Sequence, residues 1–297
     1  MKTKHANLRH WLEATRPKTL TASVCPVFLG CALAYSDGVF RPEVALLCLA
    51  VALLAQIASN FANDYFDFKK GSDGEDRLGP ERAVAGGRIA PAAMLTATFV
   101  TLGLACFCGL GLLFYAGWWL IFVGIAIAVC VLAYSAGPFP LAYRGLGDVC
   151  VLVFYGMIPV CFTYYVQAHS FNVLSFLLSL SAGLLSVNIL VVNNYRDYEQ
   201  DKAVGKRTSI VYFGRRFGRF LYLFNGIMAV VFTLPLFFLP GVTLWIAPLY
   251  IIFFLLFLGT WRELIRFQGR SLNETLAHTA RNVFLYTLLL VLTLLLR

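Results

Sequence analysis

The chain has 297 residues, of which 60% are hydrophobic and only 13% charged, and its mean hydropathy is +0.76. Ordinary soluble domains carry roughly a quarter charged residues, so this composition excludes a soluble fold and predicts an integral membrane protein. The net charge of +9 does not indicate nucleic-acid binding, because the chain has no soluble domain with a basic face. In a membrane protein, an excess of positive charge reflects the orientation of the helices in the bilayer.

Intervals without charged residues mark the membrane-spanning helices, since a span needs about 20 mostly apolar residues and a charge at its centre is costly. The first two expected spans cover residues 19–36 and 42–63, and the last covers 275–296. Three longer intervals each predict a helical hairpin: residues 89–143 break at Ala116-Gly117, residues 149–195 break near 168–170, and residues 220–261 break at Pro240-Gly241. The sequence therefore predicts an all-α integral membrane protein with nine transmembrane helices in one domain, residues 1–297.

The distribution of basic residues predicts how these helices are oriented. All 24 Lys and Arg residues except Arg41 and Arg297 fall in the N-terminal segment or in connections on the same side of the nine spans. Positive charge is retained on the cytoplasmic side of membranes. We therefore expect a cytoplasmic N-terminus and an external C-terminus.

Acidic residues gather in two clusters on this basic side, each closing an even-numbered span. Acidic cluster 1 comprises Asn63, Asp64, Asp67 and Asp73, and acidic cluster 2 comprises Asn193, Asp197 and Asp201. Spacings of three and four residues place oxygen ligands on one helix face. Hard oxygen ligands without His or Cys suit Mg²⁺, which keeps waters and phosphate oxygens in its coordination shell. The clusters predict a Mg²⁺ site completed by phosphate.

Basic residues follow each cluster. Lys70, Arg77 and Arg82 come after cluster 1, and Lys206 and Arg207 come after cluster 2. Carboxylates that hold a metal and cations that hold a diphosphate are what departure of a phosphate leaving group requires. The alternative is that the cations are ordinary solvated loop residues, but orientation alone gives no reason for two similar acidic strings. We therefore assign these five cations to diphosphate binding.

At these residues the sequence resembles the UbiA-type intramembrane prenyltransferases, which share nine helices and Asp-rich motifs at the ends of helices two and six. Within that superfamily it is most similar to the members that prenylate 1,4-dihydroxy-2-naphthoate in the menaquinone pathway. One departure is Gly71, which stands four residues after Asp67, so that the third acid comes at Asp73. The resemblance rests on five segments: residues 14–20, 63–73, 77–84, 143–148 and 193–208.

The resemblance implies transfer of a polyprenyl group from an allylic polyprenyl diphosphate to the naphthoate, with loss of diphosphate and CO₂, in the bacterial inner membrane with the site on its cytoplasmic side. It implies Mg²⁺ as cofactor and catalytic roles for Asp64, Asp67, Asp197 and Asp201. The allylic carbocation would need a dry chamber lined by aromatic residues, whose ring faces can stabilise it, and Tyr65, Tyr134 and Tyr195 are candidates; the apolar tail of the donor would enter through a lateral opening between helices toward the bilayer. Expected to bind the aromatic acid are Arg16, Lys18, Tyr134, Tyr143 and Arg144.

Two alternatives stay open at this point. A relative acting on another acceptor, such as 4-hydroxybenzoate or homogentisate, would share the metal site and differ in the acceptor pocket. A divalent-cation or phosphate transporter would also hold carboxylates in a membrane. Transporter sites usually lie near the midplane on broken helices, whereas these acids follow long apolar runs and mix with loop lysines. The sequence therefore favours an enzyme.

Overall fold

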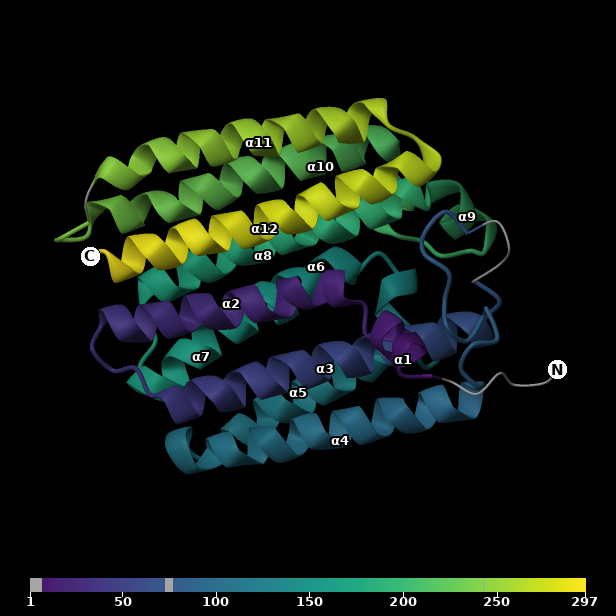
Figure 1. Ribbon diagram of the computed structural model, residues 1–297, viewed down its shortest axis with the longest axis horizontal. Coiled ribbons are helices and arrows are strands. Elements are labelled where there is room, and N and C mark those ends of the chain that lie inside the picture. Colours follow the sequence, from purple (N-terminus) through teal and green to yellow (C-terminus); the bar gives the residue numbers. More distant parts are fainter. Residues whose placement is uncertain (1–6, 73–76, 243) are drawn as a thin grey trace.

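The computed structural model describes residues 7–72, 77–242 and 244–297, and its long helices run side by side along one axis (Figure 1). Short helices connect them, among them α1 (Leu8–Ala14), the 3₁₀ turn η1 (Leu141–Tyr143) and α9 (Tyr198–Ala203). The long elements are α2 (Pro17–Ser36), α3 (Pro42–Lys69), α4 (Pro91–Ala116), α5 (Leu120–Ala133), α6 (Gly147–Leu152) continued by the π-helical turn η2 (Val153–Met157) and α7 (Ile158–Ala168), α8 (Val173–Arg196), α10 (Ser209–Thr233) continued by the 3₁₀ turn η3 (Leu234–Phe238), α11 (Ala247–Arg266) and α12 (Leu272–Leu295).

The predicted helix count agrees with this architecture. Among the described residues, eight helices are long and apolar enough to cross a membrane, and α5 adds a shorter apolar helix of 14 residues. The hairpin breaks lie where they were expected. Gly117, with φ of 90°, ends α4, and His169, with φ of 54°, ends α7. Pro240-Gly241 separates η3 from α11.

Helix α5 is shorter than the charge-free interval that contains it. The interval runs to Tyr143, but the helix ends at Ala133 and the chain then turns through Gly137, whose φ is 83°. At about 1.5 Å per residue, 14 helical residues span roughly 21 Å, less than the ~30 Å hydrocarbon core. Residues 134–146 connect α5 to α6 at the end of the bundle, and this loop borders the candidate site described below.

Helix α8 lies near the centre of the bundle (Figure 1) and is the most extensively buried of the candidate membrane spans. It contacts α10, α12, α7 and η2, and many of its residues are buried, including four serines. Small residues allow close approach of membrane helices. A Cβ added to Gly156 would lie 2.4 Å from Cα of Gly183, so η2 and α8 meet backbone to backbone. The main hydrophobic core therefore lies among α2, α7, α8 and α10–α12.

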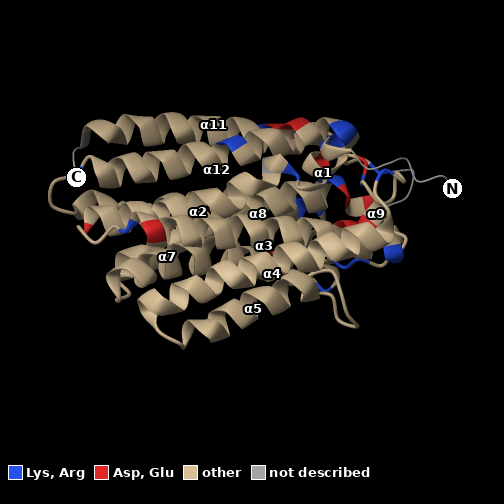
Figure 2. Ribbon diagram, turned by 60° about the horizontal axis from the view of Figure 1, so that its bottom comes forward, with Lys and Arg blue, Asp and Glu red and all other residues tan. Residues whose placement is uncertain are grey.

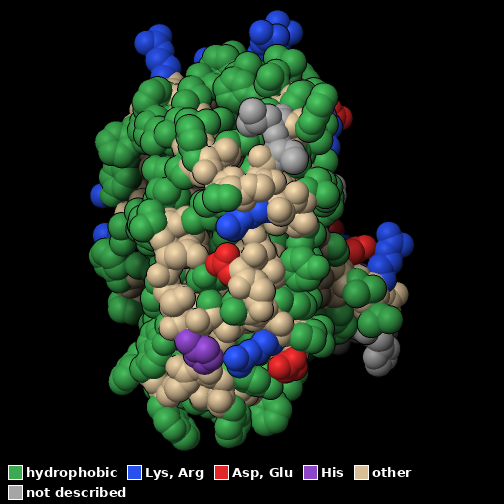
Figure 3. Space-filling view, turned by 90° about the vertical axis from the view of Figure 1, so that its left-hand side faces the viewer, with side chains coloured by type: hydrophobic (Ala, Val, Ile, Leu, Met, Phe, Trp, Pro, Cys, Tyr) green, Lys and Arg blue, Asp and Glu red, His purple; other side chains and the backbone are tan. Residues whose placement is uncertain are grey.

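Charged residues gather at one end of the bundle. Figure 2 shows Lys, Arg, Asp and Glu concentrated near α1 and α9, while the opposite end, seen face-on in Figure 3, is mostly hydrophobic with few charges. Arg297 lies at that opposite end, where its guanidinium is 3.7 Å from the carboxylate of Asp37. Both acidic clusters are thus brought to the end that carries α1.

Candidate active site

Acidic cluster 1 lies on the last turns of α3, and its first carboxylate has a structural task. Asp64 is buried, and its two carboxylate oxygens accept hydrogen bonds from the backbone N–H groups of Ala83 and Val84, both at 3.1 Å. The side chain therefore fixes the loop that follows the cluster against α3. The sequence did not predict this contact, which joins residues about 20 positions apart. The role of Asp64 as a metal ligand stays a prediction.

Asp67 faces the loop that follows α5. One of its oxygens accepts a hydrogen bond from the hydroxyl of Tyr143 at 3.0 Å, and the other lies 3.8 Å from the guanidinium of Arg82. Lys70 contacts the same loop: its Nζ donates to the backbone oxygen of Ser135 at 2.5 Å and lies 4.2 Å from the centre of the Tyr143 ring. The Ser135 hydroxyl in turn donates to Oδ1 of Asn63.

Burial and neighbouring charge act in opposite directions on Lys70. Partial burial lowers the pKa of its ammonium group, although the Asp67 carboxylate favours the charged form. The hydrogen bonds made by Asn63, Asp67 and Lys70 join cluster 1 to residues 134–143 of the loop.

Acidic cluster 2 is organised by a residue that the sequence analysis did not single out. Arg196, whose side chain is 1% exposed, donates from Nε and Nη2 to the two oxygens of Asp197, both at 2.7 Å. Its Nη2 also reaches Oδ1 of Asn193 at 2.6 Å, and its Nη1 reaches Oδ1 of Asn273 at 2.7 Å. Asn273 then donates to the backbone oxygen of Leu78 at 3.0 Å. Arg196 therefore joins cluster 2 to α12 and to the loop after cluster 1.

The second acid of cluster 2, Asp201, pairs with a lysine. Oδ1 of Asp201 lies 3.3 Å from Nζ of Lys206, whereas its Oδ2 is buried and accepts no hydrogen bond. Burial raises the pKa of Asp201 to about 6, because desolvation outweighs the attraction of Lys206. Burial alone would lower the pKa of Lys206, but Asp201, Asp67 and Asp197 together raise it above the ordinary value. The two clusters therefore share one electrostatic environment.

Three cavities meet beside these clusters. The carboxylate cavity, of about 60 Å³, is lined by Asn63, Asp67, Asn193 and Lys206, among others. The polar cavity, of about 240 Å³, contains Arg16, Arg77 and Arg82. The apolar chamber, of about 400 Å³, extends into the membrane-spanning part between α2, α3, α4, α5 and α7.

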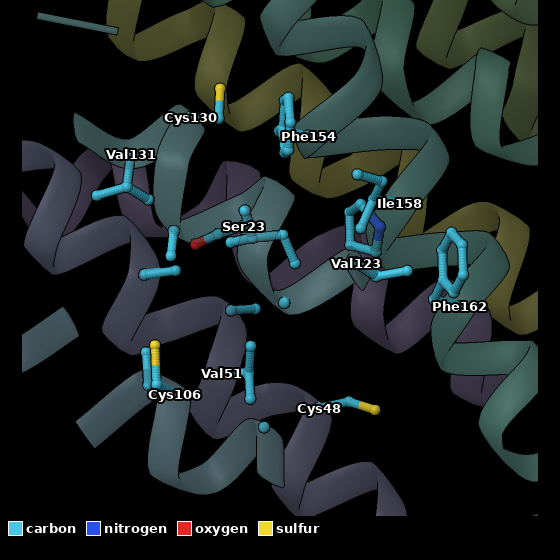
Figure 4. Close-up of a pocket in the computed structure, with 18 of the residues that line it drawn as sticks. Ser23, Cys48, Val51, Cys106, Val123, Cys130, Val131, Phe154, Ile158 and Phe162 are labelled. Carbon is cyan, nitrogen blue, oxygen red and sulfur yellow. The ribbon is translucent and has the colours of Figure 1, made fainter. Parts of the chain in front are cut away.

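Figure 4 shows the lining of the apolar chamber, including Val51, Val123, Phe154 and Phe162, projecting from several helices around one space. Tyr134, which follows α5, lines all three cavities. A Cβ added to Gly147 would lie 3.4 Å from the Tyr134 hydroxyl, so a side chain at position 147 would crowd this junction. An apolar compartment in the membrane thus joins a charged compartment at one end.

The structure separates the predicted basic residues into two groups. In the first group, Arg16 and Arg82 line both the carboxylate cavity and the polar cavity, Lys206 lines the carboxylate cavity, and Arg77 lines the polar cavity and donates to the backbone oxygen of Pro80 at 3.1 Å. Arg16 adopts φ of 53° directly before Pro17, a backbone conformation that is uncommon for a non-glycine residue, and its guanidinium reaches the backbone oxygen of Asn60 at 3.3 Å. Strain of this kind persists where the surroundings impose it, often at functional sites.

Other predicted residues lie apart from the cavities or outside the description. The exposed guanidinium of Arg144 lies 4.6 Å from the centre of the Phe139 ring, so we no longer assign it to the acceptor. Arg207 is exposed, and its backbone N–H donates to the oxygen of Tyr143. Asp73 and the side chain of Lys18 lie outside the described residues.

Two of the aromatic candidates are packing residues. Tyr195 is buried in the main core, and its hydroxyl accepts a hydrogen bond from Nε of Arg219 at 2.8 Å. Tyr65 packs against the small hydrophobic cluster that includes Phe61 and Val84. These positions correct the expectation that Tyr65 and Tyr195 line the chamber, because their rings pack among other side chains of the fold.

The donor set fits a metal ion that takes part of its coordination from a substrate. Across residues 7–72, 77–242 and 244–297, no group of three or more His, Cys, Asp and Glu side chains is arranged to hold a metal ion by itself. Carboxylate and amide oxygens of Asp67, Asn63 and Asn193 nevertheless line one small cavity, and Oδ2 of Asp201 is buried without a hydrogen bond. Such sites suit Mg²⁺, which commonly binds one or two carboxylates and completes its shell with water and phosphate.

Comparisons with known proteins agree with this geometry. A 1,4-dihydroxy-2-naphthoate octaprenyltransferase of Escherichia coli (strain K12) is 42% identical over 210 residues, covering 69% of this chain and 68% of the relative. The enzyme of the same description from Mycobacterium tuberculosis (strain ATCC 25618 / H37Rv) is 36% identical over 228 residues, covering 76% of each chain.

Solved structures share the fold at low sequence identity. A UbiA homolog from Archaeoglobus fulgidus bound to DMAPP and Mg²⁺ aligns with a TM-score of 0.64 and 15% identity, covering 95% of this chain and 98% of the other. The apo structure of a UbiA homolog from Aeropyrum pernix K1 aligns with a TM-score of 0.67 and 15% identity, covering 93% and 96%. The chain also matches the UbiA prenyltransferase family over residues 23–295, which include most of α2 and every later helix through α12. The resemblance noted from the motifs is thereby confirmed: this chain belongs to the UbiA prenyltransferase family.

Proposed function

We propose that this membrane enzyme transfers a polyprenyl group from an allylic polyprenyl diphosphate to 1,4-dihydroxy-2-naphthoate in menaquinone biosynthesis. The C1–O bond of the donor breaks to release diphosphate, a bond forms between C1 and the carboxyl-bearing ring carbon, and that carbon loses CO₂. The product is demethylmenaquinol. Relatives named for this reaction, 32–42% identical to the chain, support the choice of acceptor.

The observation that carries this proposal is the junction of an apolar chamber with a charged cavity. A polyprenyl diphosphate has an apolar tail and a highly charged head, and the two compartments meet at Tyr134. The tail comes from the bilayer, and an apolar lining matches the hydrocarbon surroundings that it leaves. The tail would thus place the diphosphate beside Asp67, Asp201 and Lys206.

The chain's own groups around the head determine how the leaving group is held. Lys206 and Arg82 lie beside Asp67 and supply cations to diphosphate oxygens. A divalent cation such as Mg²⁺, bound by oxygens of Asn63, Asp67, Asn193 and Asp201, would supply stabilisation of the charge that develops on the departing diphosphate. Arg196 holds Asp197 in place from within the bundle.

The acceptor fits the polar cavity. Its volume of about 240 Å³ suits a bicyclic aromatic acid, and Arg16 and Arg77 supply positive charge for the carboxylate. Guanidinium groups bind carboxylates in a fork that fixes orientation as well as charge. Tyr134 and Tyr155 also line this cavity and offer ring faces to the naphthalene. We accordingly place the acceptor between the arginines and the tyrosines.

The charged end of the bundle is proposed to face the cytoplasm of a bacterial inner membrane. The excess of Lys and Arg at this end supports that orientation, since basic residues are retained inside. Both substrates would then reach the site without crossing the membrane: the acid from water and the donor from the bilayer.

The test is an acceptor panel. Purified enzyme in lipid nanodiscs receives a polyprenyl diphosphate, Mg²⁺ and either the naphthoate, 4-hydroxybenzoate or homogentisate, and product masses are measured. The proposal predicts a prenylated naphthol that has lost the mass of CO₂. If 4-hydroxybenzoate is prenylated and the naphthoate is not, the proposed acceptor is wrong, while the proposed prenyl diphosphate donor stands.

A further inference from the structure

The boundary between the apolar chamber and the polar cavity is formed by four side chains. Gln56, Tyr134, Val151 and Tyr155 line both compartments. We call this set the neck. A donor with its tail in the chamber and its diphosphate among the charged residues must place its allylic carbon close to the neck. The chemistry of these four side chains therefore bears directly on bond cleavage, a step that rests on the proposed function.

Tyr155 is held at the neck by unusual backbone structure. It lies in the π-helical turn η2, which separates α6 from α7. Such turns are rare and are found frequently at functional sites. The next residue, Gly156, packs so closely on α8 that an added Cβ would lie 2.4 Å from Cα of Gly183. The backbone that carries Tyr155 is thus fixed against the centre of the bundle.

The hydroxyl of Tyr155 has its own partner. It donates a hydrogen bond to Oε1 of the buried Gln56. Nε2 of Gln56 donates to Oδ1 of Asn60 at 3.2 Å, and Asn60 donates to the backbone oxygen of Thr15 at 2.8 Å. Thr15 directly precedes Arg16, so this chain of hydrogen bonds links the neck to the turn that aims Arg16 into the cavities.

Allylic ionisation creates positive charge on a carbon, and the neck contains two aromatic rings, those of Tyr134 and Tyr155. A carbocation cannot accept a hydrogen bond, and a nearby cationic side chain would oppose it, whereas the face of an aromatic ring attracts a cation within about 6 Å. The hydroxyl of Tyr155 is directed to Gln56, which leaves the ring to line the two compartments. A ring at this place would also limit entry of water, which would otherwise capture the cation as a prenyl alcohol.

We propose that Tyr155 is a catalytic residue of the proposed prenyl transfer, with its ring against the allylic carbon of the donor, and that Gln56 is the positioning residue that fixes this ring. The sequence analysis missed both residues. Neither lies in an acidic cluster, and the signal that identifies them is their shared place at the boundary of two cavities.

The experiment measures kcat, KM for the donor, and the fraction of donor released as prenyl alcohol, in nanodiscs with Mg²⁺ and the naphthoate. Tyr155→Phe keeps the ring and should retain most of kcat. Tyr155→Leu should lower kcat about 30-fold, the equivalent of roughly 2 kcal/mol at 1.36 kcal/mol per tenfold, while KM changes less. The fraction of prenyl alcohol should rise. Gln56→Leu should show a smaller loss of kcat with the same rise in alcohol.

Tyr165→Leu is the matched control, because Tyr165 lies in α7 and its ring stacks on Phe171 instead of lining the three cavities. It should keep the wild-type kcat and alcohol fraction. If Tyr155→Leu fails to fold, mono-, di- and trifluorophenylalanine at position 155 keep the shape of the ring and weaken its attraction for cations. In that series kcat should fall stepwise.

An unchanged kcat across the fluorinated series, or a Tyr155→Leu variant within about threefold of wild type with no added alcohol, overturns the role of Tyr155. Failure of the proposed function has a different signature, namely a wild-type enzyme that prenylates another aromatic acid. The same variants are then assayed with that acid as acceptor, so the role of Tyr155 is tested in either case. A wild-type enzyme that ionises no prenyl diphosphate overturns both.

Discussion

Replacing Arg196 with lysine should destabilise the protein and slow turnover, although the substitution keeps the positive charge. Arg196 donates to both oxygens of Asp197, to Asn193 and to Asn273 from one planar guanidinium. A lysine ammonium is a compact charge on a flexible stem and cannot reach Asp197 and Asn273 together. The variant therefore loses the second bond to the carboxylate and the link to α12.

The magnitude follows from those two lost contacts. Hydrogen bonds to charged groups contribute about 1.5 to 3 kcal/mol each, and the side chain of Arg196 is only 1% exposed, so water does not replace them. Two bonds at the lower bound give a loss of roughly 3 kcal/mol in the free energy of unfolding. Arg196→Ala should cost about 3 to 5 kcal/mol, because it leaves a largely buried carboxylate without its ion pair.

The assay is an SDS unfolding titration of the purified protein in mixed micelles, with prenyl transfer measured in parallel. Arg9→Lys is the control, since Arg9 also pairs with a carboxylate but its side chain is 82% exposed. That control should leave unfolding and turnover unchanged. If Arg196→Lys were as stable and active as Arg9→Lys, the inference that Arg196 organises cluster 2 would be refuted.

Four further predictions follow from the same structure. Asp67→Asn should abolish prenyl transfer in a folded protein, because it removes a carboxylate beside the proposed diphosphate site. The control Glu43→Gln, at the opposite end of the bundle, should be nearly neutral. Wild-type turnover in Asp67→Asn would exclude the site. Gly156→Ala should lower the free energy of unfolding, since its Cβ would meet the α8 backbone, while Gly124→Ala, with open space around its Cβ, should not; equal stability of the two would contradict the packing. Removing divalent cations with a chelator should abolish turnover, and added Mg²⁺ should restore it; turnover that survives the chelator would argue against a metal. A reporter active only in the cytoplasm should work when fused to the N-terminus and fail after Arg297, and activity at both fusions would contradict nine spans.

The sequence predicted the helices well because the physical signals were local. Charge-free intervals set the spans, and glycines or a proline-glycine pair set the breaks, as the positive φ at Gly117 illustrates. Position after spans two and six was enough to bring the two acidic clusters to one end of the bundle. The length of α5 was less predictable, because a run without charges does not distinguish a helix from the turn that begins near Gly137.

The details of the site depended on contacts between distant residues. The sequence placed Asp64 with the metal ligands, yet its carboxylate binds the backbone of Ala83 and Val84. Arg196 looked like one more basic residue of a positive side until the structure showed it buried against Asp197. Tyr155 carries no motif at all, and only the meeting of two cavities singles it out.

The central claim, that the acceptor is a naphthoate alkylated at its carboxyl-bearing carbon, is tested most directly by the fate of that carboxyl group. Enzyme in nanodiscs with Mg²⁺ and a polyprenyl diphosphate receives 1,4-dihydroxy-2-naphthoate labelled at the carboxyl carbon, and released CO₂ is measured against prenylated product. The account predicts equal amounts of the two. A prenylated acid that keeps its label would contradict it.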